Sequence, residues 1–362
     1  YQCDWSSDVC SSDLCRTVLP PLLKHFPFFD ASIETPGSMN YFTQLRGLMI
    51  EVMLPLGLLV AAGALWPRLF ADAHTDVLRT QLNRMAMYVF YPCVLFAVAA
   101  STPITPALLS VPLLVGMGTL LSGALLYWLL YRTPLGRKLS DPTRAVLVIG
   151  GMWGNTFNIG APVLVFFFGR DATRYAIYND VLMTMPLVWS LGVWIATRLG
   201  SHDSNVSYAS PSTSVWRVLA TMPPIWAFAL GFASQQLGLT YQPLVSAAQF
   251  IGQATIPVLL FILGLTIPWR NLTPRPEILA VALVKLLAMP VMVWLAAGAL
   301  FEQRHEAQYA AVAQAATPAM MTTLLLADRF RLDSAMAGLI VGWTTLLFWL
   351  SLPVILALGM IR

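Results

Sequence analysis

The stretch GGMWGNTFNIGAP, residues 150–162, lies inside an apolar run from Arg144 to Phe168 that is long enough to cross a bilayer as a helix. Helix-weakening residues occupy five of its thirteen positions: Gly150, Gly151, Gly154, Gly160 and Pro162. Its polar side chains, which hydrocarbon would penalise, are those of Asn155, Thr156 and Asn158. Interrupted backbone at membrane depth is tolerated only where protein or a water-filled cavity satisfies the freed N–H and C=O groups. We therefore predict a discontinuous helix that forms a site.

The composition of the whole chain places this stretch in a membrane protein. Of 362 residues, 57% are hydrophobic and 10% are charged, the mean hydropathy is +0.70, and several runs reach twenty apolar residues. These values predict an all-α polytopic protein embedded in the lipid bilayer. The net charge of +4 comes from lysines and arginines in short loops, where it reports topology, and no nucleic-acid signature accompanies it.

The first residues differ from everything that follows. Residues 1–15, YQCDWSSDVCSSDLC, are polar and rich in cysteine and serine, and they resemble read-through of a sequencing adapter. We exclude residues 1–15 from the fold. The rest of this N-terminal tail, residues 16–38, can be read either as authentic or as foreign sequence, with Met39 as an alternative start just ahead of the first span. Three of the four cysteines lie in this tail at spacings that fit neither a zinc site nor a redox pair, and a lone Cys93 in an apolar helix is typical of a core residue. The histidines also lack metal-ligand spacing, so we expect no metal and no cofactor.

Ten apolar segments follow the tail, and most of the links between them are short. They span about 46–66, 82–101, 107–131, 144–168, 174–197, 216–237, 243–267, 276–300, 305–327 and 333–360. The longest link, 200–215, is polar and rich in serine. It separates a first five-helix half, 39–199, from a second, 216–362.

The two halves repeat weakly. PCVLF at 92–96 in the second segment matches PVLLF at 257–261 in the seventh, and MLP at 53–55 matches MPP at 222–224. The fourth segment corresponds to the ninth, which QAATP interrupts at 314–318. Because each half has an odd number of spans, the second half enters from the opposite side, which predicts a 5+5 inverted repeat with broken helices 4 and 9 crossing near the midplane. The alternative is coincidence, because proline is common in membrane helices.

Basic residues are distributed unequally between the two sides of this plan. The loops that follow odd-numbered segments hold thirteen of them, and the other loops hold five outside the N-terminal tail. The positive-inside rule places the larger group in the cytoplasm. We therefore expect a multi-pass protein of the cell membrane, with a cytoplasmic link at 200–215 and both termini outside.

Three stretches together carry a resemblance to a known family. They are LRTQLNRMAMYVFYPCVLFAVAAS at 78–101, GNTFNIGAP at 154–162 and TPAMMTTLLLADRFRLD at 317–333. With the five-plus-five plan, they resemble the auxin efflux carrier family, which includes plant PIN proteins and bacterial carriers of malate or malonate. The resemblance covers about Tyr41 to Met360, and the short central link is similar to that of the bacterial members.

This resemblance implies a scaffold of segments 1, 2, 6 and 7 that forms homodimers, and a mobile transport part that contains the crossed helices 4 and 9 and moves as an elevator. The family pattern of Gly-Asn, a second Asn and a Pro is met by Gly154, Asn155, Asn158 and Pro162. One departure is that Thr317 stands before Pro318, where plant members have an asparagine.

The chemistry of the predicted site can also be argued from the residues. A broken helix leaves a half-helix N-terminus with free N–H groups and partial positive charge, which suits a carboxylate. Asparagine and threonine side chains donate hydrogen bonds without the desolvation cost of a fixed charge. We therefore expect a substrate site for a small organic anion, formed by Gly154, Asn155, Thr156, Asn158, Pro162, Gln314, Thr317, Pro318 and Gln253. The alternatives are that the polar residues only cap the half-helices, and that Gln253, with Gln249 one turn earlier, makes a helix–helix contact.

Lys285 lies near the middle of the eighth segment, where an unpaired charge is expensive. We expect Asp180 on the fifth segment to pair with it. Such a pair either tunes proton coupling or holds helices together.

An intramembrane enzyme would need a nucleophile and base, paired aspartates or metal ligands at membrane depth, and the sequence offers no such constellation. We predict instead a secondary-active carrier of small organic anions such as dicarboxylates, working as an efflux or exchange permease with elevator-type alternating access. One alternative is an ion-coupled antiporter or symporter of related inverted-repeat plan, of sodium/proton or bile-acid type. Another is a channel or receptor. Coupling to a proton or to sodium stays open.

Overall fold

The computed structural model describes residues 41–70, 74–199, 221–303 and 305–361. The N-terminal tail, its three cysteines and the predicted link at 200–215 lie outside the described residues. The described chain is all-helical, and its one strand-like feature is an isolated bridge between Gly154 and Ala319. The predicted all-α class is confirmed.

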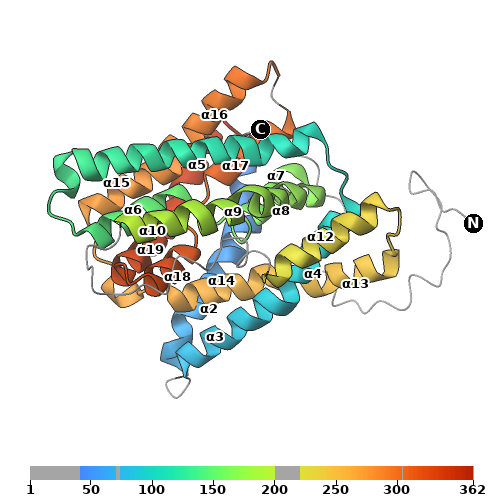
Figure 1. Ribbon diagram of the computed structural model, residues 1–362, viewed down its shortest axis with the longest axis horizontal. Coiled ribbons are helices and arrows are strands. Elements are labelled where there is room, and N and C mark those ends of the chain that lie inside the picture. The colour runs from blue at the N-terminus through green and yellow to red at the C-terminus, as the bar shows by residue number, and fades with distance from the viewer. Residues whose placement is uncertain (1–40, 71–73, 200–220, 304, 362) are drawn as a thin grey trace, which may run out of the picture. The chain divides into compact units, whose positions relative to one another are not determined.

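The first half of the described chain contains α-helices joined end to end with π-helical and 3-10 turns (Figure 1). The elements are α1 (Tyr41–Gly47), η3 (Leu48–Met53), α2 (Leu54–Leu69), α3 (Thr75–Met85), η4 (Ala86–Phe90), α4 (Tyr91–Ser101), α5 (Pro106–Arg132), η5 (Pro134–Gly136), α6 (Asp141–Met152), α7 (Gly160–Phe168), η6 (Arg170–Ala172), α8 (Thr173–Asn179), η7 (Asp180–Thr184), α9 (Met185–Leu187), η8 (Val188–Gly192) and α10 (Val193–Leu199).

The second half has the same character. Its elements are α12 (Pro223–Gln236), α13 (Gln242–Gly252), α14 (Thr255–Thr266), η9 (Trp269–Asn271), α15 (Pro276–Leu283), η10 (Val284–Ala288), α16 (Met289–Leu300), α17 (Glu306–Ala315), α18 (Thr322–Arg329) and α19 (Ser334–Ala357).

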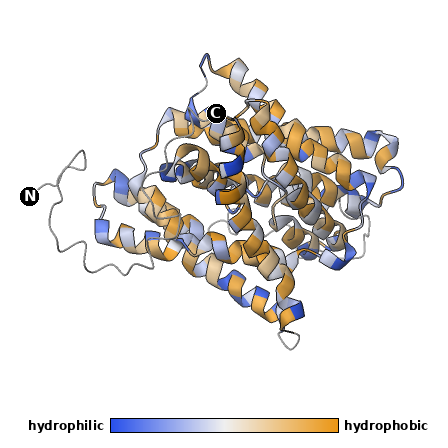
Figure 2. Cartoon of the chain, turned by 180° about the vertical axis from the view of Figure 1, so that it is seen from behind, coloured by the Kyte–Doolittle hydropathy of each residue, from blue (hydrophilic) through white to orange (hydrophobic). Residues whose placement is uncertain are grey.

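Seven continuous helical stretches in the described chain are long and apolar enough to cross a membrane. They are Tyr41–Leu69, Thr75–Ser101, Pro106–Arg132, Arg170–Arg198, Gln242–Thr266, Pro276–Leu300 and Ser334–Ala357. Figure 2 shows apolar residues along most of the helical length and hydrophilic residues gathered near the turns. The other three predicted segments give shorter helices, namely α6 with α7, α12, and α17 with α18. The count of ten spans therefore stays a prediction.

Four π-helical turns have a common cause. η3, η4, η7 and η10 each end two residues before a proline: Pro55, Pro92, Pro186 and Pro290. Proline lacks an N–H and its ring clashes with the carbonyl four residues earlier, which in each case belongs to the π-helical turn. Widening that turn by one residue relieves the clash without ending the helix, so a long span survives an internal proline.

Two pairs of helices pack at very short range. α2 contacts α14, and α4 contacts α12 (Figure 1). A Cβ atom added to Gly63 of α2 would lie 2.1 Å from the carbonyl oxygen of Phe261 in α14. One added to Gly231 of α12 would lie 2.4 Å from the carbonyl oxygen of Phe96 in α4. Glycine is required at both positions because any side chain would meet backbone, as is typical of close helix pairs in membranes.

The remaining helices pack around α5 and α6. α5 contacts α6, α16 and α17, while α6 also contacts α10 and α19. The largest fully buried side chains in the described chain include Trp153, Tyr178, Lys285 and Phe348. The burial of Lys285 needs an explanation, because a buried charge is costly without a partner.

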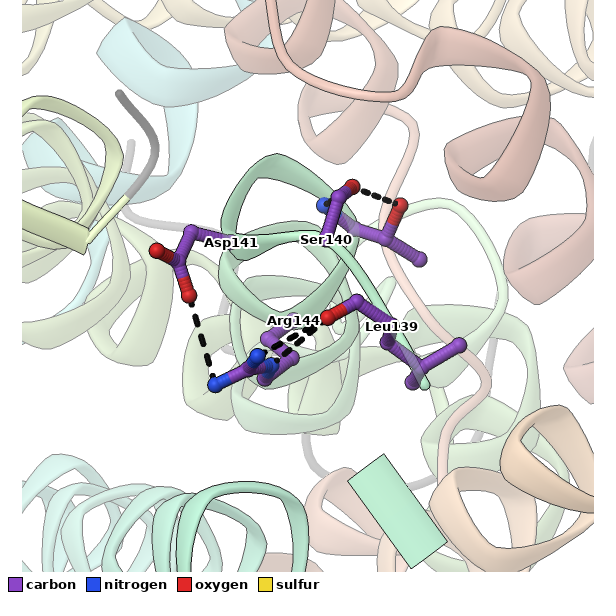
Figure 3. A network of polar contacts seen from close by, with 5 residues as sticks. Leu139, Ser140, Asp141 and Arg144 are labelled. Carbon is purple, nitrogen blue, oxygen red and sulfur yellow. Dashed lines mark hydrogen bonds and ion pairs between the residues drawn. The ribbon is translucent and has the colours of Figure 1, made fainter. Parts of the chain in front are cut away.

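The start of α6 is fixed by a polar network (Figure 3). The Ser140 side chain accepts from the Thr143 N–H at 3.4 Å, a typical N-cap arrangement. Arg144 donates to the Leu139 carbonyl through Nε at 3.0 Å and Nη2 at 2.9 Å, and its Nη1 lies 3.3 Å from Asp141 Oδ1. These contacts hold the beginning of the helix that ends at the GGMWGNTFNIGAP interruption.

The same turn is tied to the last long helix. Thr143 Oγ1 donates to Asp333 Oδ2 at 2.9 Å, and Asp333 Oδ1 accepts from the Met336 N–H at 2.9 Å. One carboxylate therefore caps α19 and anchors α6, so the two helices start at a common point.

Candidate functional site

Two non-helical segments lie where the sequence predicts helix interruptions. α6 ends at Met152 and α7 begins at Gly160, and α17 ends at Ala315 and α18 begins at Thr322. We call residues 153–159 and 316–321 together the crossing. The two segments are joined by the antiparallel bridge between Gly154 and Ala319.

Backbone hydrogen bonds hold the crossing together. The Asn155 N–H donates to the Pro318 carbonyl at 2.7 Å, and the Met320 N–H donates to the Trp153 carbonyl at 3.3 Å. Two segments separated by more than 150 residues therefore satisfy each other's backbone, which is what interrupted backbone in an apolar interior requires.

Glycine makes this approach possible. A Cβ atom on Gly154 would lie 2.2 Å from Thr317 Oγ1 and 3.0 Å from Lys285 Nζ. One on Gly160 would lie 2.9 Å from Gln314 Nε2. The two glycines thus mark the places where polar side chains of the second half press against the backbone of the first.

The half-helix ends are partly satisfied from within. The Asn155 carbonyl accepts from the N–H groups of Ile159 and Gly160, both at 3.2 Å. Thr317 Oγ1 donates to the Gln314 carbonyl at 2.7 Å, and the Ala319 N–H donates to Thr344 Oγ1 at 3.1 Å. Part of the freed backbone is therefore satisfied within the protein, and Thr317 caps the carboxyl end of α17.

Several buried polar side-chain atoms in and beside the crossing make no hydrogen bond to another described residue. Asn155 Nδ2, Gln314 Nε2 and Oε1, Asn158 Oδ1 and Trp153 Nε1 are buried atoms without a hydrogen-bond partner in the described chain. Asn155 is 6% exposed and Gln314 is fully buried. Unpartnered polar atoms are rare inside proteins and costly, so several of them around one crossing indicate a place built for a polar ligand.

Lys285 points to the same place. Its side chain is fully buried, and its Nζ donates to the Ala315 carbonyl at 2.7 Å and contacts Met289 Sδ at 3.2 Å. Ala315 is the last residue of α17, where a cation is favoured by the helix dipole. With Gly154 beside it, the ammonium group lies against both segments of the crossing.

The expected ion pair between Lys285 and Asp180 is not formed. Ion pairs among the described residues include Arg79–Asp76, Arg144–Asp141 and Arg174–Glu306, and neither Lys285 nor Asp180 belongs to one of these. Asp180 instead accepts a short hydrogen bond from the Tyr91 hydroxyl, and the hydroxyls of Thr156 and Thr184 lie beside its carboxylate. The physical reason is that the Tyr91 hydroxyl already donates to the carboxylate, while the lysine donates to the carbonyl at the end of α17.

Tyr91 links the crossing to α4. Its ring packs against that of Phe157 with centroids 4.9 Å apart, and its hydroxyl reaches Asp180 on η7. Tyr91 is not among the site residues predicted from the sequence. The only signal was its position before Pro92, where the preceding π-helical turn rotates the side chains of α4 relative to a regular helix.

The other predicted site residues fall into two groups. Thr156 and Pro318 are buried within the crossing, and Pro162, in the first turn of α7, is partly exposed. Gln253 is exposed at the C-terminal end of α13 and is not part of the buried crossing; Gln249, one turn earlier, is exposed as well. In the described part of the chain, no three histidine, cysteine, aspartate or glutamate side chains are placed to hold a metal ion.

Comparison with known proteins covers nearly the whole chain. The sequence matches the family model of membrane transport proteins over residues 48–356, a range that contains both segments of the crossing. An uncharacterized transporter of Methanothermobacter thermautotrophicus is 25% identical over 307 residues, which cover 84% of this chain and 96% of that protein. An uncharacterized transporter of Methanocaldococcus jannaschii is 26% identical over 199 residues, or 51% of this chain and 59% of that protein.

Proposed function

The chain belongs to the membrane transport protein family, the family of the auxin efflux carriers, and we propose that it is a secondary-active carrier that binds small organic anions, with a carboxylate held at the crossing. The observation that carries the proposal is the fully buried Lys285 ammonium, which has only a carbonyl and a thioether as partners among the described residues. An ammonium group in that position is incompletely compensated, and a carboxylate is the ligand that would compensate it.

The neighbouring donors support a carboxylate in particular. Asn155 Nδ2 and Gln314 Nε2 are buried and unpartnered, and they flank the glycines against which Lys285 and Thr317 pack. A carboxylate has two oxygens that each accept more than one hydrogen bond, so one ammonium and two amide donors match its capacity. A second carboxylate on the same molecule would give dicarboxylates an advantage only if it met another donor, such as Trp153 Nε1.

The packing supports the proposed ten-span inverted repeat. Exchanging each element for its counterpart in the other half turns the contact of α2 with α14 into that of α12 with α4, and both contacts are present. The contact of α5 with α17 likewise becomes that of α15 with α6. Gly63 lies against the Phe261 carbonyl, and Gly231 lies against the Phe96 carbonyl. The sequence repeat aligns these two phenylalanines. Coincidental prolines would not produce this correspondence.

Alternating access follows from the burial of the crossing. Asn155, Gln314, Thr317 and Lys285 are at most 6% exposed, so a substrate reaches them only in another arrangement of the helices. We propose that the scaffold consists of α1 to α4 with α12 to α14, that the remaining helices form the moving part, and that two copies associate through the scaffold. An elevator motion would expose the crossing to each side in turn.

Counterflow in proteoliposomes tests the function. Vesicles containing the purified protein are loaded with unlabelled malate, malonate or indole-3-acetate and diluted into the same radiolabelled anion. A carrier should accumulate label transiently above equilibrium, because the internal anion drives exchange. A channel would only equilibrate the label, and a receptor would move none, so either result would contradict the proposal.

A proton-coupled carrier is a second candidate, and the environment of Asp180 favours it. This carboxylate lies in the interior of the span Arg170–Arg198 and touches the crossing through Thr156, and Tyr91 connects it to α4. If Asp180 carries a coupled proton, an imposed pH gradient should drive net uptake in the wild type and not in Asp180→Asn, which should still exchange. If the contact between Asp180 and Tyr91 is only structural, pH-driven net uptake and exchange should fall by the same factor in Asp180→Asn.

A further inference from the structure

A cavity of about 520 Å³ lies between α2 and α19, away from the crossing. Gly57, Ala61 and Arg68 contribute its α2 side, Thr345 and Trp349 its α19 side, and Trp269 of η9 also lines it. No residue of α6, α7, α17 or α18 lines it. The volume is within the range of roughly 300–1,000 Å³ that small-molecule sites occupy, yet the proposed substrate site does not include it.

One residue that lines the cavity has an unpartnered hydroxyl. Thr345 is 5% exposed, and its Oγ1 is a buried atom with no hydrogen-bond partner among the described residues. The adjacent Thr344 faces the other way and accepts from the Ala319 N–H at the crossing. Thr345 therefore places an unsatisfied donor beside a largely apolar space, and an occupant with an acceptor group would satisfy it.

The cavity is graded from polar to apolar along α2. Gly57 lies against Trp349, because a Cβ atom there would be 2.6 Å from the indole ring. The Tyr41 hydroxyl contacts the Pro353 carbonyl and Gly57 lies against Trp349, so α19 runs opposite in direction to α1 and α2. Thr345 is one turn before Trp349, which is toward the Arg68 end of α2. Arg68 is eleven residues after Gly57, or about 16 Å at 1.5 Å per residue, and helical side chains lean back toward the N-terminus.

We propose that this cavity binds an anionic phospholipid of the surrounding membrane. The phosphate contacts Arg68, an ester carbonyl accepts a hydrogen bond from Thr345, and one acyl chain lies against Ala61, Gly57 and Trp349. A phospholipid carries an anionic group, an acceptor a few ångströms deeper and then a hydrocarbon chain, which is the order of Arg68, Thr345 and Trp349. Trp269, whose indole N–H donates to the Gly264 carbonyl at 2.8 Å, is held in place beside the head group.

The site connects the two groups of helices. α2 packs on α14, whereas α19 packs on α6 and supplies the Thr344 hydroxyl to the crossing. A lipid between α2 and α19 therefore stabilises one relative position of the two groups, and its binding should be visible as thermal stabilisation.

The test compares two lipids that differ only in head-group charge. Delipidated protein in detergent receives phosphatidylglycerol or phosphatidylcholine with identical acyl chains, and the unfolding temperature and the lipid retained in native mass spectrometry are measured. Phosphatidylglycerol should raise the unfolding temperature more than phosphatidylcholine, and Arg68→Gln should abolish that difference. Arg137→Gln, which removes an exposed charge outside the cavity, should preserve it.

Two further variants locate the lipid. Ala61→Phe fills the cavity and should lose most of the retained phosphatidylglycerol. Thr345→Val, a change of similar shape that is expected to fold, should retain several-fold less than the wild type. Equal stabilisation of the wild type by both lipids, equal loss in Arg137→Gln and Arg68→Gln, or undiminished retention in folded Thr345→Val would overturn the proposal. Displacement of the lipid by malate would also overturn it, because the cavity would then be a substrate site.

Discussion

Replacing Lys285 with methionine should separate substrate affinity from stability. Methionine has a similar length and suits an apolar interior, but it removes the ammonium group that donates to the Ala315 carbonyl. If this charge serves the substrate, binding of a carboxylate should fall sharply while the folded protein gains or keeps stability. If the lysine were purely structural, its replacement by methionine would lower the stability of the folded protein.

The size of the effect follows from the position of the charge. Lys285 is fully buried beside Gly154, so a carboxylate bound at the crossing would lie about 4 Å away, where two charges attract by about 4 kcal/mol at an effective dielectric constant near 20. Removing one partner of such a pair typically costs about 2–5 kcal/mol of binding. At 1.4 kcal/mol for each tenfold change, the dissociation constant should rise by about 30-fold to several thousand-fold.

The stability of the unliganded protein should respond in the other direction. The variant no longer buries an incompletely compensated charge, which costs several kcal/mol. It loses one hydrogen bond to a helix-terminal carbonyl, which costs about 1–3 kcal/mol when the acceptor stays unsatisfied. The unfolding temperature without ligand should therefore be equal to or above that of the wild type.

Titration calorimetry with malate and malonate, together with thermal unfolding in detergent, measures both quantities. Lys138→Met serves as the matched control, because Lys138 is exposed and lies outside the crossing. Unchanged affinity in a folded Lys285→Met protein would refute the assignment of the charge to the substrate. A loss of binding that accompanies a marked fall in unfolding temperature would refute it as well, because the lysine would then be structural.

Three further predictions concern the crossing and the topology. Asn155→Ala should weaken malate binding by about 1–3 kcal/mol, and Thr317→Ala should weaken it less because that hydroxyl already donates to a backbone carbonyl. In calorimetry, the loss of binding free energy in the double variant should differ from the sum of the two single losses. Strict additivity would place the two residues in separate sites. Gly154→Ala should lower the unfolding temperature, because its Cβ atom would lie 2.2 Å from Thr317 Oγ1. An unchanged unfolding temperature would mean that the two segments of the crossing can move apart without cost. In a cysteine-free background, Lys138→Cys should be protected from impermeant thiol reagents in intact cells and Asp171→Cys should react, both positions being exposed; reversed labelling would invert the orientation.

Local features of this chain could be predicted from the sequence because their causes are local. Several glycines and a proline weaken helix within residues 150–162, and α6 does end at Met152 before α7 begins at Gly160. The all-helical class follows from composition and from the length of the apolar runs. Four of the five π-helical turns in the described chain have an equally local cause, since a proline follows each of these four by two residues.

Contacts between distant segments could not be predicted in the same way. The direction of the Lys285 side chain depends on the rotation of the eighth segment, which the η10 turn before Pro290 alters relative to a regular helix. The partner of Asp180 is Tyr91, almost ninety residues away, because packing of α4 brings the phenol to the carboxylate. Gln253 has the right chemistry for a binding site, but it falls at the end of α13 and is exposed.

The most direct test of the central claim is to locate a bound carboxylate. Crystals grown with bromosuccinate, a dicarboxylate whose bromine scatters anomalously, would show where the anion lies. We predict an anomalous peak at the crossing, with a carboxylate within hydrogen-bonding distance of Lys285 Nζ and Asn155 Nδ2, and no peak there in Lys285→Met crystals grown under the same conditions. A peak confined to another part of the protein, or an equal peak in the variant, would contradict the account.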